Sequence, residues 1–299
     1  MTLRRIQVAR PGCRVKHSGF PLLGCVFCLL ALPASRFSPD ATAALASTND
    51  LATAPVEEVV FHAIRYGSTP EKRLWKEAAR EEVFRRGTNA LEWLVQHGWI
   101  DNIMLHVLCE EVVSRTPTNQ AVPVLLAALN SDQAPVRRLA VYFLGFFETP
   151  EHAARLLPLL QDEETAGAAI RTLGKWRVRS AVSEIVPFLQ NPKEARRIGA
   201  INALRDMGDS AAVPPLIVAL DDQFFTVRET AARALLALGP PAEAAMVRAV
   251  STAQGRQLRA LIRALAQCPG RRAGRAIRAC LKHPDPEVRA EAERALAPR

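Results

Sequence analysis

The chain has 299 residues, of which 49% are hydrophobic and only 6% aromatic, and its formal net charge is +9. This length accommodates one or two compact domains or one array of helical repeats. The first 46 residues hold six of the 39 basic side chains and one of the 30 acidic ones, so the remaining chain carries only +4. This small excess argues against a general polyanion-binding protein.

Residues 1–46 have the pattern of a secretory signal peptide. A basic start precedes the apolar run from Phe20 to Ala34, which is short for a membrane span, and small residues follow it. We expect cleavage after Ala43 or Ala46, and export to the periplasm or the extracellular space. A retained membrane anchor and an uncleaved cytosolic start are the alternatives. Cys25 also resembles a lipidation position, but the apolar run continues past it.

Residues 47–54 are polar and small and indicate a linker. Residues 55–116 then predict a degenerate helical cap with helices over 56–66, 70–86, 88–97 and 101–114. An atypical first unit is expected in a repeat array, because a terminal unit has only one neighbour. The residues expected to face inward are Leu74, Ala78, Val83, Phe84, Leu91, Leu94, Ile103, Leu105, Val107 and Leu108.

Residues 117–299 contain a repeated unit that is clearest from Ala211 to Gly239. Apolar residues at helical spacing predict two amphipathic helices, with Leu216 and Leu220 on the first and Val227 and Leu235 on the second. Asp221-Asp222 is expected to cap the second helix, and Gly239, followed by two prolines, is expected to end it.

The arginine of a Val-Arg pair gives the period of this array. The equivalent positions lie 30, 29, 32, 31 and 30 residues apart, at Arg137, Gly167, Arg196, Arg228, Arg259 and Arg289. Helix-ending glycines are expected on the same period at Gly145, Gly174, Gly208 and Gly239. Because one unit cannot bury its apolar face alone, the period predicts an all-α fold, an α-solenoid of stacked antiparallel helix pairs.

The motif Pro-x-Leu-x-x-x-Leu-x-Asp followed by Val-Arg-x-x-Ala-x-x-x-Leu-Gly resembles the short HEAT-like repeats first grouped with the phycocyanobilin lyases. The resemblance covers about 180 residues, from Thr118 to Leu296, and is weakest at Ala166-Gly167. It implies a HEAT-like superhelix. The motifs of tetratricopeptide and ankyrin repeats, which have similar lengths, are absent from the sequence.

An aspartate and an arginine recur where second helices start: Asp132 with Arg137, Asp222 with Arg228, and Asp285 with Arg289. The helix dipole opposes an arginine in a first turn, so a carboxylate from a turn of the same or the adjacent unit is expected beside it. We interpret these pairs as structural, because such contacts would fix the stacking register.

No motif in residues 47–299 predicts a catalytic site, a cofactor or a metal centre. His106 and Cys109 are three residues apart on one helix and His97 is near, but no fourth ligand has a recognisable spacing. Cys109, Cys268 and Cys280 remain after the leader. We expect buried free thiols, with a bridge between Cys268 and Cys280 as the alternative.

The segment between Ala244 and Pro284 contains no Asp or Glu. Its nine basic residues are Arg248, Arg256, Arg259, Arg263, Arg271, Arg272, Arg275, Arg278 and Lys282. A solvated helix face is one interpretation. The other is a surface for an anionic partner: an acidic protein, phospholipid head groups, or nucleic acid if the chain is not exported. No aromatic residue follows Phe225, which argues against base stacking.

The candidate partner-binding residues form two groups. Three arginines share one side of a second helix and three share one side of the next first helix, so that adjacent units would combine their charge. These residues are Arg256, Arg259, Arg263, Arg271, Arg275 and Arg278. The second group is Arg138 with Tyr142, at the end of an aromatic cluster that otherwise fits the core.

The sequence therefore predicts a non-catalytic scaffold for protein–protein contacts in the cell envelope. Two alternatives remain open. The lyase resemblance implies an accessory subunit, lyase-like or chaperone-like, for cofactor attachment. A chain that is not exported would also permit nucleic-acid binding, as in HEAT-like DNA glycosylases.

Overall fold

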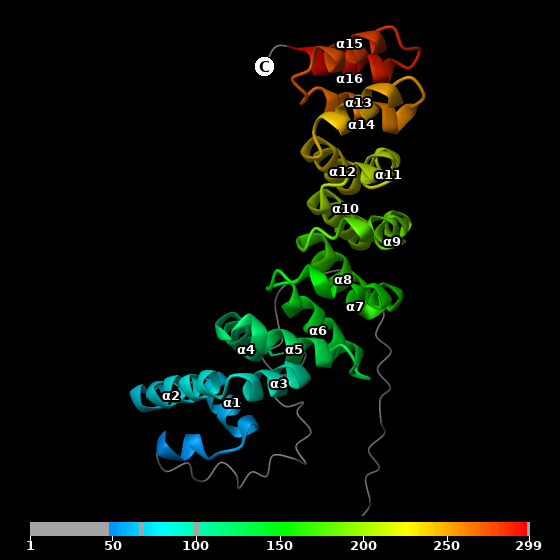
Figure 1. Cartoon of the computed structure of the whole chain (residues 1–299). Helices are drawn as coiled ribbons and strands as arrows, with labels where there is room; N and C mark the ends of the chain where they lie inside the picture. The colour runs from blue at the N-terminus through cyan, green and yellow to red at the C-terminus, as the bar shows by residue number, and fades with distance from the viewer. Residues whose placement is uncertain (1–47, 66–68, 99–101, 298–299) are drawn as a thin grey trace, which may run out of the picture. The chain divides into compact units, whose positions relative to one another are not determined.

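The computed structural model describes residues 48–65, 69–98 and 102–297, and all regular elements in these ranges are helices (Figure 1). This confirms the predicted all-α fold. The predicted signal peptide and its cleavage sites lie outside the described residues. Within the described ranges, no helix combines the length and the apolar character that a membrane crossing requires.

The N-terminal cap consists of a 3-10 helix and four α-helices. They are η2 (Thr48–Ala52), α1 (Val56–Ile64), α2 (Pro70–Arg86), α3 (Thr88–His97) and α4 (Ile103–Arg115). Thr69 caps α2 by accepting a hydrogen bond from the backbone N–H of Lys72. The cap and the repeats belong to one compact unit that begins at Ser47.

Within the linker predicted over residues 47–54, the described residues from Leu51 to Ala54 pack onto α2. Leu51 is only 2% exposed. The Nη2 of Arg86 donates to the carbonyl oxygens of Leu51 and Ala54, at 2.7 Å each. A single apolar residue among small polar ones carries no periodic signal, so the sequence alone gave no indication of this contact.

Three residues of the cap that were expected to face inward are exposed instead. Leu74 on α2 is 65% exposed, and Ile103 and Val107 on α4 are 75% and 39% exposed. The buried stripe of α4 starts at Leu105 and continues through Leu108, Cys109 and Val112. Ile103 and Val107 lie outside this stripe, and they form part of a groove described below.

Six helix pairs follow the cap, and Figure 1 shows them in succession from α5 to α16. The first helices are α5 (Thr118–Ala128), α7 (Ala153–Leu156), α9 (Val182–Ile185), α11 (Val213–Ala219), α13 (Pro240–Ala249) and α15 (Arg271–Cys280). The second helices are α6 (Ala134–Leu144), α8 (Glu163–Lys175), α10 (Glu194–Met207), α12 (Phe225–Ala237), α14 (Gly255–Leu265) and α16 (Pro286–Leu296).

The first helices of two repeats are broken into shorter pieces. A 3-10 turn, η4 (Leu157–Gln161), follows α7, and another, η6 (Val186–Gln190), follows α9. Each turn has a proline, Pro158 or Pro187, at its second residue. Proline has no N–H to donate to the preceding turn, so the α-helical ladder is interrupted there.

The second helices form one row, in which each packs against the next from α6 to α16. The core lies between this row and the first helices. Four residues predicted to be buried in the clearest repeat are fully buried: Leu216, Leu220, Val227 and Leu235. The stacked-pair interpretation of this unit is therefore confirmed.

Two of the predicted helix ends differ in the structure. Gly174 lies inside the last turn of α8, where a Cβ would stand 2.7 Å from the Cα of Ala203 on α10. This glycine therefore permits close packing and does not end the helix. Helix α12 starts at Phe225 without a side-chain cap, since Asp222 accepts from the N–H of Phe224, one residue earlier.

Candidate partner-binding surface

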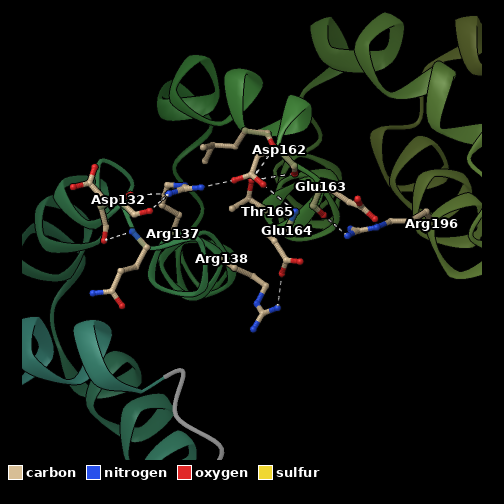
Figure 2. A network of polar contacts seen from close by, with 11 residues as sticks. Asp132, Arg137, Arg138, Asp162, Glu163, Glu164, Thr165 and Arg196 are labelled. Atoms are coloured by element: carbon tan, nitrogen blue, oxygen red, sulfur yellow. Dashed lines mark hydrogen bonds and ion pairs between the residues drawn. The ribbon is translucent and has the colours of Figure 1, made fainter. Parts of the chain in front are cut away.

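The second helices of neighbouring repeats are joined by arginine side chains that we call rungs. In α6, Arg137 donates from Nη1 to the carbonyl oxygens of Ser131 and Asp132, at 2.8 and 3.0 Å. Its Nη2 donates to the carboxylate of Asp162, at 2.6 Å, in the loop before α8. Figure 2 shows this guanidinium between the two loops. The rung ties a loop to its own helix and to the next repeat.

The carboxylate of Asp162 serves two contacts at once. It pairs with Arg137, and it caps α8 by accepting from the N–H of Glu164 at 3.0 Å. The hydrogen bond from Arg137 is the main reason that the pKa of Asp162 lies below its ordinary value, and partial burial opposes this effect. The ionised form of Asp162 is therefore stabilised by the fold.

A second complete rung joins α10 to the loop before α12. The Nη1 of Arg197 donates to the carbonyl oxygens of Asn191 and Pro192, at 2.7 and 3.2 Å. Its Nη2 donates to Asp222 at 3.1 Å, and its Nε lies 2.7 Å from the other carboxylate oxygen. The side chains of Arg197 and Asp222 are only 7% and 12% exposed. This rung is the more deeply buried of the two.

The rungs correct the predicted repeat register in three units. Each arginine that bonds to its own loop is the fourth residue of a second helix, and the fourth residues are Arg137, Ala166, Arg197, Arg228, Leu258 and Arg289. The predicted positions Gly167, Arg196 and Arg259 are each one residue away. The Val-Arg pair is missing in these three units, so spacing alone could not fix their register.

The predicted aspartate–arginine pairs do not form within single units. Asp132 and Asp222 offer their carbonyl oxygens, not their carboxylates, to Arg137 and Arg228. Asp285 instead caps α16 by accepting from the N–H of Glu287 at 2.8 Å. The carboxylates that do pair with rung arginines come from the adjacent unit, which was the second source considered from the sequence.

Further polar contacts extend the rung region along α8, as Figure 2 shows. Arg138 lies 3.4 Å from the carboxylate of Glu164. Arg196 crosses α8 and donates to the carbonyl oxygen of Glu163 at 2.6 Å. A Cβ on Gly167 would stand 1.7 Å from the Nη1 of Arg196, so the glycine leaves room for this crossing.

A groove of about 630 Å³ brings together Arg138 and Tyr142, the second group of predicted partner-binding residues. The exposed side chains of Ile103 and Val107 also line it, and Arg171 of α8 stands at its border. None of these three residues was expected at a binding site from the sequence. Ile103 and Val107 had been assigned to the core, and Arg171 belongs to no repeated motif.

The hydroxyl of Tyr142 already has a partner inside this groove. It donates to a carboxylate oxygen of Glu110 at 2.9 Å. Burial raises the pKa of Tyr142, and the hydrogen bond to Glu110 raises it further. The ring of His106 lies beside the Tyr142 ring, tilted by 56°, with centroids 5.9 Å apart. The polar tip of Tyr142 is thus fixed, while the apolar wall from α4 faces outward.

The structure separates the two predicted arginine triplets. Helix α14 lies in the row of second helices, whereas α15 lies among the first helices. Arg259 and Arg263 of α14 form ion pairs with Glu287 and Glu291 of α16, the second at 3.0 Å. These glutamates follow the acid-free segment in sequence. Arg259 and Arg263 are therefore partly neutralised, which the segment alone did not indicate.

The arginines of α15 are exposed and form no ion pair or hydrogen bond with any described residue. They are Arg271, Arg272, Arg275 and Arg278. Two of them stand in the first turn of α15, which contains no acidic residue, so the helix dipole opposes their charge. Like charges three and four residues apart also repel one another.

A groove of about 650 Å³ lies between α13, α15 and the loop before α14. Arg272, Arg275 and His283 contribute its basic side chains, and no acidic residue lines it. Hydroxyl and amide groups come from Ser251, Thr252 and Gln254, and the apolar lining includes Val247, Val250 and Leu258. Arg272 was noted in the acid-free segment but was not among the predicted binding residues.

The three cysteines of the described residues are free thiols. Cys109 and Cys280 are buried, and burial raises the pKa of all three thiols. His97 stacks on Trp93, with ring centroids 4.2 Å apart. No group of three or more His, Cys, Asp or Glu side chains within the described ranges is arranged to hold a metal ion.

Comparison with known proteins identifies the type of repeat in the middle of the chain. The family of HEAT repeats matches residues 160–236, which run from the end of the η4 turn into α12. The resemblance to HEAT-like repeats is confirmed over these residues, and the described chain has the fold of an all-α, HEAT-like solenoid. None of the curated proteins matches the sequence.

Several solved structures are similar to this chain at low sequence identity. The Escherichia coli protein YibA is 15% identical, with 87% of this chain and 97% of that chain covered and a TM-score of 0.46. The complex of CpcE and CpcF of phycocyanin lyase from Nostoc sp. is 16% identical, with 81% and 94% covered and a TM-score of 0.37. Human deoxyhypusine hydroxylase is 19% identical, with 83% and 96% covered and a TM-score of 0.31.

Proposed function

We propose that this chain is a non-catalytic scaffold that binds an acidic segment of a protein partner in the cell envelope. The observation that carries the proposal is the set of α15 arginines. Their charges lie beside a groove that no acidic residue lines. A carboxylate-rich segment bound there would relieve their mutual repulsion and oppose the unfavourable helix dipole.

The shape of this basic surface favours a protein segment over the other anionic partners considered. A groove of about 650 Å³ accepts an extended chain, whereas a flat membrane surface contacts only its rim. The groove has no aromatic lining residue on which bases would stack. The partner class is therefore an acidic peptide segment, and vesicle binding becomes an outcome of the test.

The test uses a fluorescein-labelled polyglutamate peptide and fluorescence anisotropy at low and moderate salt. The variant Arg271→Glu/Arg275→Glu/Arg278→Glu reverses three of the four arginine charges of α15 and leaves the paired Arg259 and Arg263 in place. A matched control, Arg179→Glu/Arg233→Glu/Arg294→Glu, makes the same charge change on exposed residues outside the groove.

Wild type and control should bind the peptide with an affinity that falls as salt increases, because salt screens surface charge. The α15 variant should bind at least about tenfold more weakly, which corresponds to 1.4 kcal/mol. Equal affinities of the variant and the control would overturn the proposal. So would binding of vesicles of anionic lipid without binding of the peptide.

The proposed location in the cell envelope is tested separately, by determining the N-terminus of the mature protein. If residues 1–46 are a cleaved signal peptide, mass spectrometry of the protein purified from its source should find a mature chain that begins at Ala44 or Ser47. An intact chain that begins at Met1 or Thr2 would show that the envelope assignment is wrong.

A further inference from the structure

Complete rungs join α6 to the loop before α8 and α10 to the loop before α12, whereas the rung that starts from α12 is incomplete. In the two complete rungs, the arginine binds two carbonyl oxygens of its own loop and the carboxylate of an aspartate in the next loop, Asp162 or Asp222. Arg228, the fourth residue of α12, makes only the first half of this arrangement. Its Nη1 donates to the carbonyl oxygens of Asp222 and Gln223, at 2.8 and 3.0 Å.

The rest of the Arg228 guanidinium has no hydrogen-bond or ion-pair partner among the described residues, although it lies 5.7 Å from the centre of the Phe225 ring. The carboxylate of Asp222 is already paired with Arg197. The next loop, residues 250–254, contains no acidic residue, and its positions equivalent to Asp222 and Asp162 are Thr252 and Gln254. The Nε of Arg228 is buried without a hydrogen bond. A buried donor in this state costs free energy until an acceptor reaches it.

The surroundings of Arg228 are strongly basic. The pKa of Arg228 lies below its ordinary value. Burial is the largest cause, and the positive charges of Arg256, Arg263 and Arg259 on α14 lower the pKa further, whereas the negative charge of Asp222 raises it. Arg259 and Arg263 have glutamate partners on α16. Arg256 reaches only the carbonyl oxygen of Asp221, at 3.3 Å. Arg228 and Arg256 thus have no carboxylate partner in the described chain.

We propose that Arg228 and Arg256 bind one carboxylate of a partner's acidic segment, at the place that Asp162 and Asp222 occupy in the complete rungs. The proposal rests on the proposed function and adds a defined contact to it. Thr252 and Gln254 also line the basic groove beside α15, so one bound segment reaches both places. The Nε and Nη2 of Arg228 donate no hydrogen bond to a described residue, and this side of a planar guanidinium suits a carboxylate, the group that both complete rungs use.

The test completes the rung with a carboxylate that a substitution places in the chain itself. In the variant Thr252→Asp the new carboxylate should take the partner's place at Arg228. We expect a higher melting temperature and about tenfold weaker binding of the labelled polyglutamate peptide. Thr252→Asn, which has the same shape without the charge, should change neither property. Ser251→Asp adds the same charge to the groove at a position that is not part of a rung.

Combining each variant with Arg228→Gln shows whether its effect comes from a restored rung or only from the added negative charge in the groove. The gain in melting temperature from Thr252→Asp should disappear when Arg228→Gln is also present, whereas any effect of Ser251→Asp should not depend on Arg228. The variant Arg228→Gln alone should weaken peptide binding about tenfold. If Arg228→Gln folds poorly, the comparison of Thr252→Asp with wild type still tests the proposal, because Thr252→Asp retains every wild-type contact of Arg228.

The outcomes distinguish this inference from the proposed function. If Thr252→Asp and Ser251→Asp behave alike in stability and in binding, the carboxylate site at Arg228 is wrong. The proposed function survives that result as long as the wild-type protein binds the peptide and the α15 variant does not. If the wild-type protein does not bind the peptide at all, both proposals are overturned.

Discussion

Arg197 and Asp222 form an ion pair between two adjacent repeats, and each side chain is almost completely removed from solvent. Removal of the carboxylate alone would leave a buried guanidinium without its counter-charge. We expect Asp222→Ala to lower the free energy of unfolding by about 3 to 5 kcal/mol. Asp162→Ala, in the more exposed rung, should cost about 1 kcal/mol. Urea denaturation of both variants checks this, and equal losses would contradict it.

Asp162 predicts a dependence of stability on pH. Its pKa is lower in the folded chain than its ordinary value of 3.8. The stabilisation is therefore complete above that ordinary value and is lost as the pH falls through the folded pKa. Asp162→Asn should be less stable than wild type at neutral pH, and the difference should shrink in acid. Denaturation curves at neutral and acidic pH measure it; a difference that grows in acid would refute the assignment.

Two glycines in neighbouring second helices predict opposite effects of alanine. A Cβ on Gly174 would meet the backbone of Ala203, whereas nothing lies within 4 Å of a Cβ on Gly199. We expect Gly174→Ala to destabilise the fold by about 1 to 3 kcal/mol. Gly199→Ala should stabilise it by about 0.5 to 1 kcal/mol, because glycine is unfavourable inside a helix. Melting temperatures that shift in the same direction would show that the packing of α8 on α10 is misplaced.

Leu220 tests the packing between the two helices of one repeat. Its side chain is fully buried, while the neighbouring Val218 is 57% exposed. Leu220→Ala should cost about 2 to 5 kcal/mol through the lost contacts and the cavity. Val218→Ala serves as the control and should change the free energy of unfolding by less than about 0.5 kcal/mol. A loss of that small size for Leu220→Ala would contradict the stacked arrangement.

The fold could be predicted from the sequence because its signals are local and repeated. The spacing of Leu216, Leu220, Val227 and Leu235 already defines two buried helix faces. Proline and glycine positions added the helix limits, so that α2 and α3 have the predicted bounds. The register of the weak units could not be found in this way, since the rung arginine of α10 is the second of two adjacent arginines.

The candidate site was less predictable, because it depends on contacts between units. The acid-free segment drew attention to its arginines, but the glutamates that pair with Arg259 and Arg263 come from the following helix. The missing carboxylate partner of Arg228 could not be predicted from the sequence for a similar reason. Asp222 lies six residues before it and looks like its partner, yet its carboxylate binds Arg197 from the preceding repeat.

The missing contact between Arg228 and the next loop also affects where the array of repeats unfolds locally. In a stack of repeats, cooperativity depends on the coupling between neighbours. We expect the junction between α12 and α14 to be a weak point, so that the amides of α13 to α16 exchange hydrogen through openings that leave α10 and α12 closed. A partner carboxylate held at Arg228 would couple the two sides, and protection in the last two repeats would then rise towards that of the preceding ones.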